Sequence, residues 1–371
     1  MRLLIAAGGT GGHIYPALAV ASSLRRRPSP PELAWIGGPR GLESRLVPEA
    51  GLPFRRLVLR SLRSVEADVH LVLDPIRLGL SVPQAVALLI ARRPAAIFTT
   101  GGYVAIPILV AARTLRIPSL LWEGNVVPGK SVRATASLAS ALAVSFGRTC
   151  AALGRGRPCF ETGTPLRDVG AVDRVAARER LGIRGADRLL VVFGGSQAVR
   201  RFNDAVAEAL PELAERAVVI HVTGTDGHHA ARASRDRLPA ELRHRYRPQP
   251  YLGEGLLEAL AAADLVVGRA GSSTLAEATA LGLPAIVVPY PHAGAHQAAN
   301  AEVVAAAGAA RLIPDAEFDG AALLAATSIL ERPAEHAAMA AAARSLGRPG
   351  AAAAVADLLL ALAERRPLPT A

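Results

Sequence analysis

The sequence predicts an α/β protein of two domains, each built on a parallel β-sheet. Three observations lead to this fold class. Short apolar runs alternate with helical stretches, which is the pattern of parallel sheets covered by helices on both faces. The second half of the chain starts this pattern again, with its own strand and double-glycine turn. The length of 371 residues, 51% of them hydrophobic, is too great for one ordinary core and suits two.

Three strands are expected in the first domain, at residues 3–5, 96–98 and 117–122. The first apolar run is too short for the hydrophobic region of a signal peptide, so it is interpreted as a strand. A glycine-rich turn follows it, and a helix should begin near Pro16, because proline is favoured in the first helical turn. Gly101-Gly102 and a helix through Leu115 follow the second strand.

The second domain repeats this order, with strands expected at residues 189–193, 218–222, 265–267 and 285–288. A helix is expected around residues 203–213. The joint between the domains should lie near Gly163-Thr164-Pro165, where glycine and proline end the first alternating series. We therefore predict a first domain at residues 1–163, a second at 164–348, and a helical tail at 349–371 that packs back on the first domain.

The charge balance narrows the class of ligand. Lys and Arg number 42 against 31 Asp and Glu, which gives a net charge of +11. Such a charge favours nucleic acid, phosphorylated ligands or an anionic lipid surface, although an Arg-rich proteome would produce it too. Aromatic residues make up only 4%, and no basic segment interleaves with them. Nucleic-acid binding by base stacking is therefore not expected.

Cysteine content and hydropathy bear on the compartment. Cys150 and Cys159 do not form a Cys-x-x-Cys pair, so we expect two inert thiols in a reducing compartment. No window resembles a membrane span, because the longest uncharged stretch, residues 278–301, contains prolines and histidines. The protein should therefore be soluble or peripheral to a membrane.

The densest motif is Gly8-Gly9-Thr10-Gly11-Gly12, with His13 directly after it. Glycines at a strand-to-helix turn let backbone N–H groups approach an anion, and the helix dipole adds positive potential. No Gly-Lys-Ser/Thr follows, and no acidic residue stands at the dinucleotide spacing, which disfavours a P-loop NTPase and a dehydrogenase. A tight structural turn is the alternative. His13 is a candidate general base, since a histidine pKa lies near working pH.

Two polar turns in the second half are candidate diphosphate sites. Ser196, in the Gly-Gly-Ser-Gln turn, offers a hydroxyl and an N–H at a helix start, although a simple N-cap is the alternative. Ser272, Ser273 and Thr274 offer hydroxyls and amides at another turn. Glu277 is placed to accept from a ribose diol, and the alternative is a helix capping box with Thr274.

A resident metal is not expected. His292 and His296 lack a nearby carboxylate or third histidine, and the chain contains no Asp-x-Asp. Amides, hydroxyls and arginines should neutralise the phosphates, so no cofactor is predicted to be required, and stimulation by a divalent cation stays open. Parallel-sheet proteins bind ligands at the carboxyl ends of strands, so these loops should converge on one cleft between the domains.

Taken together, these segments resemble the MurG-type N-acetylglucosaminyltransferases of peptidoglycan synthesis, a family with the GT-B fold. The resemblance covers Gly8 to about Asn300 and rests on GGTGGHIYPALAVA at 8–21, GGYVAIPILVAA at 101–112, GGSQ at 194–197, RAGSSTLAEATALGLPAIVVP at 269–289 and HQAAN at 296–300. It implies two Rossmann-like domains facing across a cleft. It also implies inverting transfer of N-acetylglucosamine from UDP-GlcNAc to lipid I, undecaprenyl-pyrophosphoryl-N-acetylmuramyl-pentapeptide, which gives lipid II for the cell wall.

The resemblance also implies roles for single positions. The polyprenyl acceptor would meet the first domain, and the donor would lie mainly in the second. The donor sugar or acceptor diphosphate would contact Thr10, Gly11 and Gly12, with His13 as the general base, or Glu123 if it faces the cleft. Donor contacts are implied for Asn125, Arg167, Ser196, Leu252, Ser272, Ser273, Thr274, Glu277 and Gln297.

The chain departs from the family pattern in four places. It has Trp122-Glu123-Gly124-Asn125 for the usual His-Glu-Gln-Asn, Ala198 for a glycine, Gly294-Ala295 without the usual acidic residue, and Thr164-Pro165 for Asn-Pro. Three alternatives therefore stay open. They are transfer to another lipid-phosphate or natural-product acceptor, a UDP-sugar 2-epimerase, and a non-catalytic nucleotide-sugar-binding scaffold at the membrane.

Residues 60–93 are a candidate membrane face. This segment mixes leucines, isoleucines and valines with Arg60, Arg63, Arg77, Arg92 and Arg93. A basic rim on an apolar stripe is typical of a peripheral protein on an anionic bilayer, whereas an ordinary core helix is the alternative. The polyprenyl acceptor implied by the resemblance favours the membrane, so we predict a peripheral protein on the cytoplasmic side of the cell membrane.

Overall fold

The computed structural model describes residues 1–39, 41–59, 70–153, 156–167, 169–195, 200–253, 255–291 and 296–369, with only the backbone at 70–75 and 171. The chain divides into two compact units, Met1–Arg167 with Gly350–Ala371, and Asp168–Pro349. The first unit therefore continues past the predicted joint at residue 163. Trp122 Nε1 donates to Gly163 O, and the hydroxyls of Ser145 and Thr164 are 2.7 Å apart, so this segment stays attached to the first sheet.

The first unit contains a seven-stranded parallel sheet in the order β3-β2-β1-β4-β5-β6-β7 within its described residues. Its strands are β1 (Arg2–Ala6), β2 (Glu32–Gly37), β3 (Phe54–Arg56), β4 (Ala96–Thr99), β5 (Ser119–Glu123), β6 (Ala141–Val144) and β7 (Cys159–Glu161). Its helices are α1 (Gly11–Arg25), α2 (Glu43–Glu49), α3 (His70–Arg92), α4 (Gly102–Thr114), α5 (Lys130–Thr135), α6 (Arg148–Leu153) and α15 (Ala351–Ala363), with a short 3₁₀ turn η1 (Ala136–Leu138).

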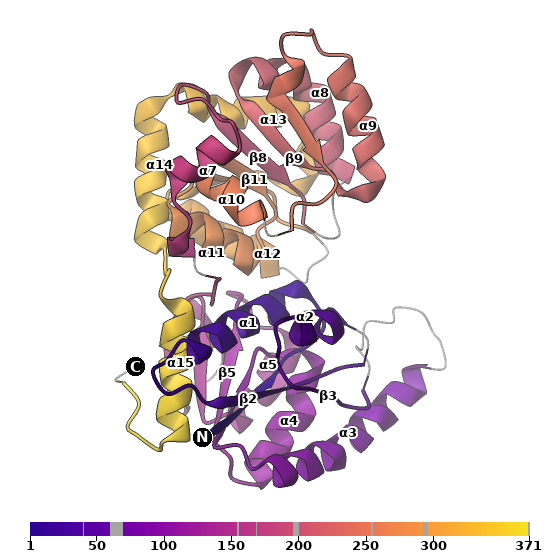
Figure 1. Cartoon of the computed structure of the whole chain (residues 1–371), viewed down its shortest axis with the longest axis vertical. Helices are drawn as coiled ribbons and strands as arrows, with labels where there is room; N and C mark the ends of the chain where they lie inside the picture. The colour runs from indigo at the N-terminus through magenta and orange to yellow at the C-terminus, as the bar shows by residue number, and fades with distance from the viewer. Residues whose placement is uncertain are drawn as a thin grey trace. The chain divides into compact units, whose positions relative to one another are not determined.

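Helices cover both faces of this sheet (Figure 1). Leu3 and Ile5 of β1 pack with α1, α2 and α15, whereas Leu4 and Ala6 pack with α3 and α4 on the opposite face. Successive side chains of a strand point to opposite faces, so a run of apolar residues is what a strand buried on both faces needs. The predicted parallel sheet is confirmed.

The predicted C-terminal tail forms one helix, α15, that lies along α1 in the first unit (Figure 1). Val355 and Leu359 are fully buried in the core that α1 helps to form. The stretch Pro333–Ala363 is, by length and composition alone, apolar enough to cross a membrane, and the sequence analysis did not single it out. This is weak evidence for a span, because the stretch is two helices, α14 (Pro333–Leu346) and α15, in different units.

The second unit contains a six-stranded parallel sheet in the order β10-β9-β8-β11-β12-β13 within the part of the chain that is described. Its strands are β8 (Leu189–Phe193), β9 (Val218–Val222), β10 (Tyr246–Gln249), β11 (Leu265–Gly268), β12 (Ala285–Val287) and β13 (Ala310–Leu312). Besides α14, its helices are α7 (Arg174–Arg180), α8 (Arg200–Arg216), α9 (Gly224–Asp236), α10 (Gly255–Ala262), α11 (Ser272–Leu281), α12 (His296–Ala306) and α13 (Gly320–Thr327). Its 3₁₀ turns are η2 (Val169–Ala171), η3 (Arg243–Arg245), η4 (Asp315–Glu317) and η5 (Ser328–Glu331).

Both sheets have the same topological switch point. In each unit the first strand is an interior strand, with the next two strands on one side and the later ones on the other. Ligands of such sheets bind outside the carboxyl ends of the strands where the order reverses. The switch points lie between β1 and β4 in the first unit and between β8 and β11 in the second. The glycine-rich turns of the sequence follow these four strands.

The two cysteines form a disulfide, so the prediction of inert thiols was wrong. Cys150 in α6 and Cys159 at the start of β7 have Cα atoms 5.9 Å apart and are bonded. A spacing of nine positions gives no sign of this pairing. The proximity arises because β7 pairs with β6, so that the connecting helix α6 lies beside the start of β7.

Candidate active site

The first glycine turn connects β1 to α1 and forms the start of that helix. The helix begins at Gly11 rather than near Pro16, which lies inside it. Thr10 is the extended N-cap residue, and its carbonyl accepts from the N–H groups of His13 and Ile14. The amides of Gly11 and Gly12 therefore belong to the first helical turn, where N–H groups lack an acceptor within the helix. This is an arrangement that suits a phosphate.

His13 lies on the same turn, with its ring against the end of β4. Its Nδ1 is 2.7 Å from Thr100 O, and Thr100 Oγ1 donates back to the His13 carbonyl at 3.1 Å. A carbonyl oxygen only accepts, so Nδ1 carries the proton and the lone pair of the neutral ring is on Nε2. The ring is half-buried. This tautomer gives a general base whose accepting atom is fixed.

Glu123, the second candidate base, is used differently. Its side chain is buried at the end of β5. Oε1 accepts from the backbone N–H and the side-chain amide of Asn125, both at 2.9 Å, and Oε2 accepts from Gly129 N at 2.9 Å. Both carboxylate oxygens thus hold the loop that carries Asn125. The geometry favours His13 over Glu123 as the proton acceptor.

The substitution of tryptophan in this segment has a structural reason. Trp122 is 1% exposed and packs in the core of the first unit, while its indole N–H donates to Gly163 O. Its side chain therefore points away from the loop of Asn125. Arg167, the predicted donor ligand at the end of the first unit, is exposed and lies 5.9 Å from the ring centroid of Tyr15 in α1.

In the second unit, the turn after β11 leads directly into a helix. Gly271 is the N-cap of α11, so Ser272, Ser273 and Thr274 form its first turn. The capping-box alternative is wrong, because a capping box needs Thr274 at the N-cap position. Three residues with hydroxyls and amides therefore lie at a helix N-terminus, and Glu277 lies one turn further on the same helix.

The remaining predicted donor ligands come from neighbouring turns of this sheet. Gln297, in the first turn of α12, accepts from Tyr290 N at 2.9 Å through Oε1, which leaves its NH₂ group to donate elsewhere. Leu252 is partly buried after β10. Gly194 and Gly195 follow β8, and Gly195 has a φ of 73°, where a side chain would be strained. Ser196 lies outside the described residues, as do Ala198, His292 and Gly294-Ala295.

Arg269 has a role that the sequence did not reveal. It is 7% exposed and lies between the rings of Phe202 and Tyr290, at 4.9 and 5.3 Å from their centroids. Its guanidinium forms an ion pair with Asp315 and donates to Val288 O. It thereby joins the ends of β11 and β12 beneath the candidate donor loops. Its position in a motif was the only available signal, since its partners are distant in sequence.

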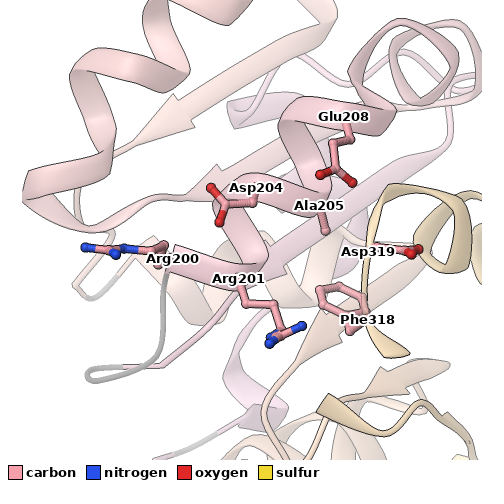
Figure 2. Close-up of a pocket in the computed structure, with 7 residues that line it drawn as sticks. All are labelled: Arg200, Arg201, Asp204, Ala205, Glu208, Phe318 and Asp319. Carbon is pink, nitrogen blue, oxygen red and sulfur yellow. The ribbon is translucent and has the colours of Figure 1, made fainter. Parts of the chain in front are cut away.

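A hollow of about 400 Å³ opens on α8 and on residues 318–319, and Figure 2 shows its lining. None of the predicted site residues that the structure describes is among its lining residues. Arg201 pairs with Asp315 at 3.2 Å, Glu208 accepts from Gly320 N at 2.9 Å, and Asp319 caps α13. These three charged side chains therefore have structural partners within the second unit. Within the described residues, no group of three or more His, Cys, Asp or Glu is placed to hold a metal.

Comparisons with known proteins show the family. The glycosyltransferase family 28 N-terminal domain matches residues 3–144, and the family's C-terminal domain matches residues 189–357. An N-acetylglucosamine transferase of Desulforudis audaxviator is 38% identical over 340 residues, which cover 89% of this chain and 90% of that protein. Its counterpart in Moorella thermoacetica is 39% identical over 331 residues, with coverage of 87% and 88%. Both are described as UDP-N-acetylglucosamine–N-acetylmuramyl-(pentapeptide) pyrophosphoryl-undecaprenol N-acetylglucosamine transferases.

Solved structures give the fold. The crystal structure of MurG from Acinetobacter baumannii matches with a TM-score of 0.78 and 28% identity, covering 97% of this chain and 99% of that one. A putative UDP-N-acetylglucosamine 2-epimerase from Listeria monocytogenes matches at 0.73 with 14% identity, covering 99% and 97%, and shares the fold alone. The GT-B class is thus confirmed. This chain belongs to glycosyltransferase family 28, and within it to the MurG family.

Proposed function

We propose that this glycosyltransferase moves N-acetylglucosamine from UDP-GlcNAc to lipid I, which gives lipid II for peptidoglycan. Relatives at 38% and 39% identity that carry this activity in their names match almost the whole chain. The observation that carries the proposal is that the glycine turn, His13 and the first turn of α11 all stand at the carboxyl ends of the switch-point strands. UDP-GlcNAc and a polyprenyl-pyrophosphate acceptor are the partners that this arrangement fits.

The chemistry is direct displacement at the anomeric carbon, with inversion. The acceptor hydroxyl attacks, its proton passes to Nε2 of His13, and the bond to UDP breaks. The Nδ1–Thr100 hydrogen bond keeps the lone pair on the accepting nitrogen and stabilises the imidazolium that forms. Helix N-termini and arginine stabilise the departing diphosphate, because fixed donors aimed at developing charge need no reorganisation during reaction.

Donor recognition is proposed to use the second unit. The amides and hydroxyls of Ser272, Ser273 and Thr274 bind the diphosphate at the N-terminus of α11. Glu277 accepts from the ribose diol, and the amide of Gln297 donates to the sugar hydroxyls. We assign Leu252 to the uracil and Asn125, Arg167 and Ser196 to further donor contacts.

Product analysis with and without acceptor tests the proposal. The protein is incubated with UDP-GlcNAc and a lipid I analogue, and UDP and glycosylated lipid are measured. Both should appear only when both substrates are present. Conversion of UDP-GlcNAc without acceptor would identify an epimerase instead. Absence of UDP release with every acceptor would identify a non-catalytic scaffold, and transfer only to a different acceptor would identify a related transferase.

We propose that no metal is required, because donors and arginines can neutralise the diphosphate. Activity should therefore survive treatment with EDTA and desalting. Stimulation by added Mg²⁺ is measured in the same assay. Complete loss of activity in EDTA, restored by Mg²⁺, would contradict this part of the proposal.

We further propose that α3 rests on an anionic membrane surface at the cytoplasmic side. Ile76, Leu80 and Ile90 on this helix are 53%, 59% and 54% exposed, and Arg92 and Arg93 follow near its end. Exposed apolar side chains beside arginines suit a peripheral helix. Arg77 of the predicted face also lies on α3 and is half-buried, whereas Arg60 and Arg63 lie outside the described residues.

Vesicle sedimentation tests the membrane proposal. Wild-type protein should bind vesicles that contain anionic phosphatidylglycerol, and bind them less at high salt, since salt screens the arginines. Leu80→Asp should reduce binding severalfold. Val175→Asp, at an equally exposed apolar residue of α7, is the matched control and should not. Equal recovery of both variants would remove α3 from this role.

A further inference from the structure

Glu43, the first residue of α2, is a carboxylate placed in the interior of the first unit. Its side chain is 0% exposed. Its described partners are all hydrogen-bond donors: Gly9 N reaches Oε2 at 3.0 Å, Gly38 N reaches Oε1 at 3.0 Å, and the hydroxyl of Tyr103 reaches Oε1 at 3.2 Å. An ionised carboxylate accepts only, so this set of partners matches it. Burying a charged carboxylate costs free energy of folding unless its oxygens are hydrogen-bonded, as they are here.

The chain leaves space for this carboxylate by having glycine around it. A Cβ at Gly8 would be 2.6 Å from Oε1, and one at Gly41 would be 2.0 Å from Oε2. A Cβ at Gly37 would be 2.8 Å from Cγ of the same side chain. Distances below 3 Å are not tolerated between such atoms, so any side chain at these positions would displace Glu43. Gly8 after β1, Gly37 at the end of β2 and Gly41 before α2 thus leave the space that the side chain of Glu43 occupies.

The hydrogen bonds of Glu43 connect the two turns of the switch point. Gly9 belongs to the glycine turn after β1, and its φ of 103° is one that glycine adopts without strain. Tyr103 follows Gly101-Gly102, the turn after β4. Burial first, and then the charge of Glu43 and its hydrogen bond, raise the pKa of Tyr103 above its ordinary value, so its hydroxyl stays a donor.

His13 lies where these two turns meet. A Cβ at Gly102 would be 3.7 Å from Nε2 of His13, so the ring packs directly against the second turn. On its other side, the ring is hydrogen-bonded through Nδ1 to the carbonyl of Thr100. The position of Nε2 therefore depends on how the two turns are held relative to each other, and Glu43 is a bridge between them.

We propose that Glu43 is a positioning residue for the transfer reaction. It fixes the turn after β1 relative to the turn after β4, and thereby holds His13 Nε2 in place relative to the amides of Gly11 and Gly12. The expected effect on kcat rests on the proposed function. Independently of turnover, the carboxylate of Glu43 keeps the N–H of Gly9 hydrogen-bonded in the interior of the first unit. Glu43 itself does not touch substrate.

The kinetic test uses Glu43→Gln, which keeps the volume but turns one acceptor into a donor. We expect kcat to fall by about tenfold to a hundredfold, since small misplacement of a reacting group can cost as much. The KM for UDP-GlcNAc should stay within about twofold, because the donor turns of the second unit are untouched. Tyr103→Phe, which removes one donor, should give a smaller loss of the same kind. Thr135→Val, at a buried hydroxyl of α5, is the control and should change neither.

A second pair of variants tests whether the effect passes through the carboxylate. Gly41→Ala should lower kcat as Glu43→Gln does, because the new Cβ would be 2.0 Å from Oε2 and would displace the carboxylate. In a Glu43→Ala background the same change should cost nothing more, since the obstructed atom is gone. Equal losses in both backgrounds would overturn the proposed route. A loss in Glu43→Gln that appears wholly as a raised donor KM would also overturn it.

Hydrogen exchange gives a readout that needs no turnover. The Gly9 amide should exchange slowly in the wild type and at least about tenfold faster in Glu43→Gln, with Gly194 and Gly195 unchanged. Equal protection of Gly9 in both proteins would refute the positioning claim. If the wild type makes no lipid product yet Gly9 behaves as expected, the proposed function fails while the role of Glu43 in the turn stands.

Discussion

At His13, the backbone carbonyl of Thr100, just after β4, decides which ring nitrogen accepts a proton. The ring is 2.7 Å from Thr100 O through Nδ1, so Nε2 carries the lone pair of the neutral side chain. The same carbonyl would stabilise the protonated ring during reaction. Glu123 shows the opposite arrangement, because both of its oxygens are occupied by N–H groups of its own loop. Two side chains that look alike as candidate bases in the sequence are thereby distinguished.

Replacing His13 by alanine should lower kcat by at least about tenfold and by as much as 10²–10⁴-fold, the range of a positioned general base. Steady-state rates with a saturating lipid I analogue measure this. His229→Ala, at an exposed histidine of α9, is the matched control and should leave the rate unchanged. A wild-type rate in His13→Ala would remove the residue from this role.

His221 predicts a pH dependence of stability. It is 0% exposed in β9, its Nδ1 is 2.8 Å from the Tyr246 hydroxyl, and burial lowers its pKa from 6.5 to about 3. Between these values the unfolded chain binds a proton that the folded unit does not. The free energy of unfolding should therefore fall as pH drops from about 6.5 towards 3, by up to about 1.4 kcal/mol per pH unit.

Urea unfolding at several pH values, followed by circular dichroism, checks this expectation. His221→Gln keeps a partner for Tyr246 and should flatten the acid-side loss of stability. His244→Gln, at an exposed histidine, should leave it as in the wild type. If the slope of His221→Gln matches that of the wild type, the proton uptake belongs to other groups.

At the scale of elements, helix α6 shows how a short segment fixes a functional loop. Thr149 Oγ1 donates to Asn125 O at 3.0 Å, so α6 supports the loop after β5. The next residue, Cys150, is bonded to Cys159 on β7. The disulfide thus attaches this helix to the edge strand of the sheet. The loop of Asn125, a predicted donor ligand, is thus hydrogen-bonded to a helix that a disulfide holds in place.

Replacing both cysteines by serine should lower the free energy of unfolding of the first unit by about 2–3 kcal/mol, the loop-closure estimate for a ring of this size. Both tryptophans, Trp35 and Trp122, are buried in the first unit, so their fluorescence follows its unfolding in urea. Thiol titration of the denatured, unreduced protein should find no free thiol. Two titratable thiols per chain would show that the bond does not form.

At the scale of the whole molecule, the first unit is completed by the last segment of the chain. The second unit is one continuous stretch, Asp168–Pro349, whereas the first needs residues from Gly350 onward. Val355, Ala356 and Leu359 of α15 are fully buried against the first sheet. The core of the first unit therefore includes residues separated from it in sequence by the entire second unit.

Truncation after Pro349 should destabilise the first unit selectively. Each fully buried aliphatic side chain contributes about 1.5–3 kcal/mol, so loss of Val355 and Leu359 alone removes several kcal/mol. The fluorescence transition, which reports the first unit, should shift to a lower urea concentration. Circular dichroism reports both units, and its transition for the second unit should stay at the same urea concentration. Truncation after Arg366, which keeps α15, should shift it much less. Equal effects of the two truncations would contradict this role of the helix.

The sequence by itself determined the fold class and the place of the ligand turns. Buried parallel strands need continuous apolar runs, and strand-to-helix turns near an anion need glycine. Leu189–Phe193 can therefore be recognised as a strand, and Gly8–Gly12 as a ligand turn, from the sequence alone. Only the tertiary structure decided which side chains meet and where each helix begins. Cys150 meets Cys159, Gly271 rather than Thr274 caps α11, Asp315 pairs with Arg269, and Glu43 joins Gly9 to Tyr103. Local patterns record what each segment must bury or bend, whereas a hydrogen bond or a disulfide across the fold leaves no periodic trace in the chain.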